Sequence, residues 1–126
     1  METQSKVGQI GWLDITVEDA SALRDFYAEV VGWKPEAVSM GEYDDYMMGM
    51  PESGEPAAGV CHARGSNTDM PRQWLIYIIV ADLDKSIEAC KAHGGELIAE
   101  PRGAGNGQFC IIKDPSGAIA ALYQES

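Results

Sequence analysis

The chain carries one pattern of strand and helix signals twice, and this repeat limits the folds open to it more than any other feature. A shift of 63 residues places Val17 on Val80, Asp19 on Asp82 and Gly32 on Gly95. Each half reads as a strand, a helix and three further strands, and the likeness is one of pattern rather than of letters. Two open sheets, each with a helix on its outer face, have to bury their inner faces. The repeat therefore predicts an α+β fold of two βαβββ modules with a central cleft between paired sheets.

Local signals place the elements of both halves. In the first half, alternating apolar residues predict a strand over 8–17, Asp19 is expected to cap a helix and Gly32 to end it. Further strands are predicted at about 34–39, 43–50, 57–63, 74–80, 95–100, 107–114 and 117–124, with a second helix over 81–95. The glycine-rich segment 100–109 is expected to be a flexible hairpin, and 114–117 a type I turn.

Length and composition narrow the class of protein. The 126 residues predict one domain, with a first module at about 8–63, a polar linker at 64–71 and a second module at about 72–125. A net charge of -11 argues against nucleic acid or an anionic membrane as a partner. No apolar run approaches membrane-spanning length, and the three cysteines have no CxxC spacing. We therefore expect a cytoplasmic protein with free thiols.

Two motifs carry a resemblance to a known family. The string D-x6-FY-x4-GW lies within residues 17–33, and DP-x-GA lies within 105–123, with supporting segments at 57–60 and 71–101. Together they resemble the vicinal oxygen chelate superfamily, which includes glyoxalase I, bleomycin resistance proteins and extradiol dioxygenases. The likeness is greatest to the subgroup of lactoylglutathione-lyase-related and antibiotic-biosynthesis-hydroxylase-like proteins. The resemblance implies the glyoxalase-like fold, a partial barrel of two modules, and a homodimer.

The resemblance also allows the family's metal site to be tested. Metal-dependent members place His, Glu or Gln ligands near the start of the first strand and on the last strand of each module. Three of these four positions fall here on Trp12, Leu75 and Ala121, whose side chains cannot ligate a metal. The fourth falls on Cys61 or His62, which as strand neighbours point to opposite faces. One ligand does not make a site, so we expect no metal and no other cofactor.

Strand alternation groups the candidate ligand-binding residues. If Trp12 faces the cleft, Asp14 does too, and the 63-residue shift adds Leu75 and Tyr77. The segment 43–50 adds Tyr43 or Tyr46 and one of Met47 and Met48, with the inward parity left open, and Cys110 lies on a strand that can face either side. The predicted pocket comprises Trp12, Asp14, Tyr46, Met48, His62, Leu75, Tyr77, Cys110, Ala121 and Tyr123.

Two functions are compatible with such a pocket. The first is a binding protein that holds a small aromatic or apolar molecule by stacking, without chemistry. The second is an enzyme of the lyase, isomerase or oxygenase type. It would use Asp14 as a general acid or base, or a divalent metal at a non-standard site that includes Cys61 or His62. The plainer alternative is that these side chains only fill the space between two sheets. We favour the binding protein.

Overall fold

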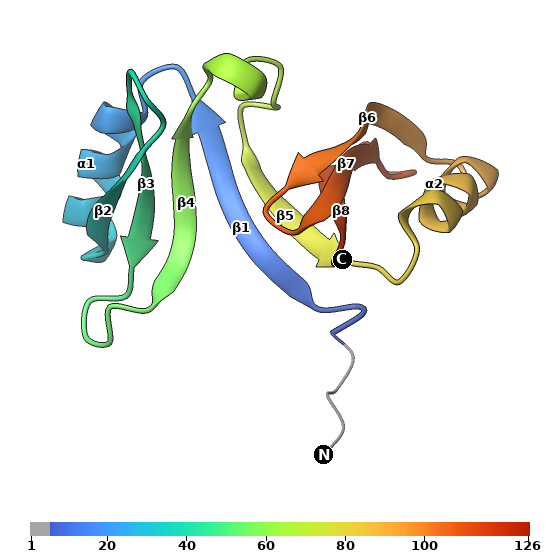
Figure 1. Cartoon of the computed structure of the whole chain (residues 1–126), viewed down its shortest axis with the longest axis horizontal. Coiled ribbons are helices and arrows are strands. Elements are labelled where there is room, and N and C mark those ends of the chain that lie inside the picture. The colour runs from blue at the N-terminus through green and yellow to red at the C-terminus, as the bar shows by residue number, and fades with distance from the viewer. Residues whose placement is uncertain (1–5) are drawn as a thin grey trace. The chain divides into compact units, whose positions relative to one another are not determined.

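A computed structural model describes residues 6–126 and divides them into two compact units. The first unit is residues 13–74, and the second unit joins residues 75–126 to the start of the chain up to Trp12. In Figure 1, α1 and β2 to β4 belong to the first unit, and α2 with β6 to β8 belongs to the second. Strand β1 (Ile10–Val17) crosses the boundary between the units.

The first unit is a four-stranded sheet covered on one face by a helix. Its strands lie in the order β2-β3-β4-β1, where β1 runs parallel to β4 and the other pairs are antiparallel. The added strands are β2 (Lys34–Ser39), β3 (Asp44–Gly49) and β4 (Pro56–His62). Helix α1 (Ala20–Val31) begins after Asp19, whose carboxylate accepts a hydrogen bond from the Ala22 N–H, and ends at the left-handed Gly32. Both ends agree with the sequence prediction.

The core of the first unit lies between α1 and the sheet. Four buried residues form it: Ala20, Tyr46, Met48 and Val60. Five partly buried side chains pack against them: Ile15, Val17, Leu23, Tyr27 and Trp33. Successive side chains on a strand alternate, so this core defines one face as the helix side. We call the opposite face of each sheet its helix-free face.

The second unit repeats the connectivity of the first. Strands β5 (Trp74–Ile79), β6 (Glu96–Ala104), β7 (Gly107–Lys113) and β8 (Ile119–Gln124) lie in the order β5-β8-β7-β6, with β5 parallel to β8. Helix α2 (Leu83–Ala92) is capped by Asp82, which accepts from the Lys85 N–H at 3.2 Å. No helix in the described part of the chain is long and apolar enough to cross a membrane.

The two units confirm the prediction of an α+β chain with two βαβββ modules. The segment 100–109 differs from the loose hairpin that its glycines suggest. Strand β6 continues to Ala104, with Arg102 opposite Phe109, so the chain stays paired almost to the turn. Shifts of register on either side of Ala99 bend β6 ahead of Pro101, whose missing N–H cannot join a regular ladder.

The segment that links the modules is tied to the first unit. Arg72 forms two hydrogen bonds of 2.8 Å with the carboxylate of Glu18, just after β1. The Arg64 guanidinium lies 4.4 Å from the centre of the Tyr43 ring. A short 3-10 helix, Gly65–Asn67, lies between these contacts. The linker is therefore held against the end of β1 by named side-chain contacts.

Candidate functional site

Strand register sorts the candidate residues of the first unit between its two faces. Thr16 of β1 lies opposite Cys61 of β4, and both Asp14 and Met47 lie opposite Gly59. Side chains of directly opposed residues project from the same face of a sheet. The core already assigns the alternate positions to the helix side. The helix-free face therefore carries Asp14, Thr16, Asp45, Met47 and Cys61.

Asp45 brings a buried, hydrogen-bonded carboxylate to this face. The residue is 7% exposed, and its Oδ1 accepts a hydrogen bond from the backbone N–H of His62 at 2.8 Å. The same oxygen lies 3.7 Å from His62 Nδ1. A backbone donor of this kind offsets part of the cost of removing a carboxylate from water. This hydrogen bond therefore fixes the position of the Asp45 carboxylate in the sheet.

The thiol of Cys61 responds to this charge. Burial raises the pKa of the Cys61 thiol, and the carboxylates of Asp14 and Asp45 raise it further by charge repulsion with the thiolate. A hydrogen bond with Asp45 acts in the same direction. The thiol stays protonated at neutral pH, and a protonated thiol is a poor nucleophile and a poor metal ligand. The helix-free face is thus a place of negative potential.

Thr16 supplies a hydroxyl to the same face. The residue is only 3% exposed, and its hydroxyl makes no hydrogen bond with any side chain or backbone group among residues 6–126. Within that range, no fully buried side-chain nitrogen or oxygen lacks a partner. The hydroxyl is therefore the part of Thr16 that remains within reach of a small molecule.

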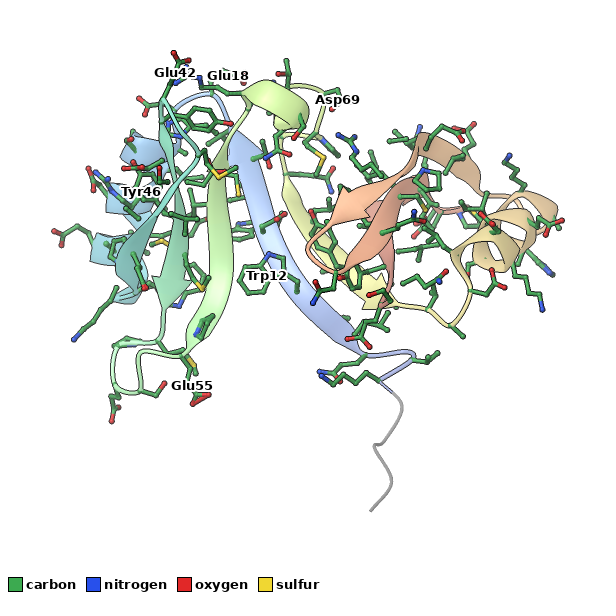
Figure 2. The ribbon with its side chains drawn as sticks, viewed as in Figure 1. Trp12, Glu18, Glu42, Tyr46, Glu55 and Asp69 are labelled. Carbon is green, nitrogen blue, oxygen red and sulfur yellow. The ribbon has the colours of Figure 1, made fainter. Side chains whose placement is uncertain are left out.

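Trp12 precedes Asp14 by two residues in β1, so both side chains project from the same side of the strand. Figure 2 shows the indole of Trp12 beside β1. The side chain is half-buried. An indole of this kind offers a flat face for stacking on a planar group.

Three predicted pocket residues lie on the helix side instead. The Tyr46 hydroxyl is 2.9 Å from Ser21 Oγ on α1, and Met48 is fully buried in the core beneath that helix. His62 lies opposite Val17, and its Nδ1 is 2.8 Å from the Asp44 carbonyl oxygen. These residues lie on the opposite face from Asp14, because side chains alternate between the two faces along a strand. The sequence alone did not decide which of two neighbouring residues faces the cleft.

The second unit places four predicted residues on its helix-free face. Tyr77 lies opposite Ala121, and Leu75 and Tyr123 follow by alternation and register. Leu75 and Ala121 are fully buried. The Tyr77 ring meets Phe109 edge-on, with 5.6 Å between ring centroids. Arg102 projects from the same face, because it lies opposite Phe109, and its guanidinium is 5.4 Å from the centre of the Phe109 ring. This face therefore combines apolar side chains with a cationic one.

Cys110, also a predicted pocket residue, lies on the helix side of the second unit. It packs in the core against Leu83 and Ile87 of α2. Burial raises the pKa of Cys110 to about 11. The residue behaves as a small apolar core side chain, the usual role of a buried free cysteine.

The residues at the family's ligand positions do not fit a divalent metal. Trp12, Leu75 and Ala121 offer no donor atom to a metal. Of the fourth pair, Cys61 supplies a single donor on the helix-free face and His62 lies on the helix side. The described residues contain no group of three or more His, Cys, Asp or Glu side chains placed to hold a metal ion.

Comparison with known proteins supports the fold and the resemblance. The family model described as "Glyoxalase/Bleomycin resistance protein/Dioxygenase superfamily" matches residues 9–121. The chain is 28% identical over 128 residues to "Putative glyoxylase CFP32" of Mycobacterium tuberculosis, an alignment that covers 97% of this chain and 48% of that protein. It is 27% identical over 139 residues to the anthracycline biosynthesis protein DauV of Streptomyces sp. (strain C5), with 98% and 49% covered. The chain thus spans about half the length of these relatives.

Solved structures show the same architecture. Methylmalonyl-CoA epimerase from Mycobacterium tuberculosis superposes with a TM-score of 0.60 at 18% identity, covering 100% of this chain and 93% of the epimerase chain. A variant of the Streptomyces coelicolor methylmalonyl-CoA epimerase gives a TM-score of 0.57 at 17% identity, covering 95% and 99%. At such identities the likeness concerns the fold alone. It confirms the prediction of a glyoxalase-like fold.

Proposed function

We propose a function for a chain that belongs to the Glyoxalase/Bleomycin resistance protein/Dioxygenase superfamily: it binds a small organic molecule on the helix-free face of its first unit, without a metal ion. The observation that carries the proposal is the set of polar side chains on that face. Asp14, Thr16 and Asp45 stand where a sheet that served only as a core would bury apolar groups.

We assign no reaction to the chain because of the side chains that this face carries. Cys61, the one thiol of this face, keeps its proton and cannot serve readily as a nucleophile. Three of the family's four ligand positions carry no metal donor, so no step is assigned to a Lewis acid. Asp14 is our candidate acid or base, and turnover of a bound molecule would assign it that role. The expected homodimer and cytoplasmic setting belong to the same proposal.

Elemental analysis of the purified chain tests the metal-free part. We expect less than about one metal ion per ten chains after dialysis against metal-free buffer, because Trp12, Leu75 and Ala121 offer no donor atom at three of the four ligand positions. Stoichiometric zinc, nickel, iron or manganese would overturn this part and favour the enzyme with a non-standard metal site.

A thermal-shift screen of small aromatic and apolar compounds tests the binding site. We expect some compounds to raise the melting temperature of the wild type, and we expect Thr16→Val to reduce that shift. The matched control is Phe26→Ala, because Phe26 is 54% exposed on α1 and lies away from the helix-free face. Ligand shifts that persist unchanged in Thr16→Val, or that vanish equally in the control, would refute the assignment of the site.

A further inference from the structure

We infer that the molecule bound on the helix-free face of the first unit carries a protonated amine, which the Asp14 carboxylate accepts. This inference rests on the proposed function and adds the chemical class of the ligand. Three independent features of the first unit support it: the distribution of its charges, the hydroxyl of Thr16, and the acceptor capacity of Asp14.

The charges of the first unit favour a cation. Residues 13–74 contain twelve acidic and four basic side chains, which gives this unit a formal charge of −8. The whole chain has a net charge of -11. Three of the four basic groups are engaged in contacts described for this unit. Arg24 pairs with Asp25, Arg72 pairs with Glu18, and Arg64 covers the Tyr43 ring. A field of this sign draws cations to the surface and repels anions.

The acidic groups extend beyond the helix-free face. Figure 2 shows Glu18, Glu42 and Asp69 at the same end of the first unit, where β1 ends and the linker begins. Asp45 and Asp14 add two more carboxylates on the sheet. A cationic ligand therefore meets negative charge along its approach and at the site.

Thr16 gives a second observation that does not depend on charge. It lies opposite Cys61 and projects from the same face as Asp14, two residues away in β1. Thr16 is 3% exposed, and no hydrogen bond of its hydroxyl lies within the described residues. Because no fully buried side-chain oxygen there lacks a partner, this hydroxyl is not fully buried and stays accessible. A ligand group on this face can therefore form a hydrogen bond with it.

Asp14 can accept a ligand without giving up its present contacts. A carboxylate has two oxygens with about four acceptor positions, so an interaction already made within the protein leaves others for an ammonium group. The raised pKa of Cys61 supports the same sign of potential, since both Asp14 and Asp45 contribute to it.

The experiment uses matched triplets of compounds that share one ring and differ in one group. The probes are tryptamine, tryptophol and indole-3-acetate, together with phenethylamine, 2-phenylethanol and phenylacetate. Isothermal titration at pH 7 and low salt measures the dissociation constants for the full chain. We expect the amine of a triplet to bind at least about tenfold more tightly than its alcohol, with the carboxylate weakest.

Single-residue variants test which side chains cause the preference for the amine. Asp14→Asn should reduce the amine preference to within about twofold while the alcohol still binds. Asp44→Asn should retain the preference, because Asp44 is exposed and alternates to the helix side. Thr16→Val should weaken both the amine and the alcohol. In the wild type, raising the salt from 50 to 500 mM should lower amine affinity and leave alcohol affinity nearly unchanged, a check that needs no variant.

The outcomes separate this inference from the proposed function. Binding of the alcohol or carboxylate as tightly as the amine, or an amine preference unchanged in Asp14→Asn, would overturn the inference and leave the binding function standing. A wild type that binds no member of the triplets and no compound of the wider aromatic screen would overturn the proposed function itself, and this inference with it.

Discussion

Replacement of Asp45 separates the structural role of this carboxylate from its charge. Its Oδ1 accepts the His62 N–H at 2.8 Å, and the residue is 7% exposed. In Asp45→Ala the backbone N–H of His62 loses its acceptor in a largely buried position. A donor left unpaired in this way costs about 1–3 kcal/mol. We therefore expect the free energy of unfolding to fall by about 2 kcal/mol.

The corresponding change in melting temperature follows from the size of the chain. An unfolding entropy near 2.1 cal/mol/K per residue gives about 0.26 kcal/mol/K for this chain, so a loss of about 2 kcal/mol lowers Tm by about 8 °C. Asp45→Asn keeps an oxygen in place to accept the same N–H, and we expect it to cost less than about 1 kcal/mol. The contrast between the two variants measures the hydrogen bond rather than the charge.

Urea unfolding followed by circular dichroism and tryptophan fluorescence measures both variants. The control is Asp44→Ala, which removes an exposed neighbouring carboxylate and should change stability by less than about 0.5 kcal/mol. Equal losses in Asp45→Ala and Asp45→Asn would mean that the charge, and not the hydrogen bond, stabilises β3 and β4. No loss in the alanine variant would refute the reasoning altogether.

Three further predictions follow from the same geometry. Cys61 should react with iodoacetamide at pH 8 at least about tenfold more slowly than a small free thiol, because its raised pKa keeps it protonated; peptide mass spectrometry reads the rate, and an ordinary rate contradicts the electrostatics. Gly107→Ala should lower the free energy of unfolding by about 1–3 kcal/mol, because its new Cβ would overlap the Gln124 backbone carbonyl oxygen and lie 2.7 Å from the Tyr123 hydroxyl. Gly103→Ala meets no atom within 4 Å and should be neutral in the same urea assay. Met48→Ala should lower the free energy of unfolding by about 2–5 kcal/mol, because Met48 packs in the core under α1. Ligand affinity, measured by titration, should not change. A folded variant that loses affinity would show that Met48 belongs to the binding site.

The sequence predicted the elements of this chain well because their signals are local. A carboxylate at Asp19 or Asp82 caps a helix through atoms only three residues away, and Gly32 ends a helix by its own backbone angle. The order of these signals, repeated after 63 residues, then determines two βαβββ modules. The segment 100–109 was harder to predict, because its pairing depends on β7 rather than on its own glycines.

The candidate site followed from the sequence only in part. Alternation along β1 joins Trp12 and Asp14 whatever the rest of the chain does, and the same reasoning groups Leu75 with Tyr77. It could not choose between Cys61 and His62, or between Met47 and Met48. Tyr46 and Cys110, predicted for the pocket, instead pack under helices.

What the sequence by itself determined was the set of elements and their duplication. The register between strands decided which side chains share a face with Asp14. A strand's own sequence gives a period of two but no direction, and a slip of one residue exchanges its faces. Alternation along β1 already groups Thr16 with Asp14, but only the pairing of β1 with β4, and the packing of α1 on the other side, brought Cys61 to their face.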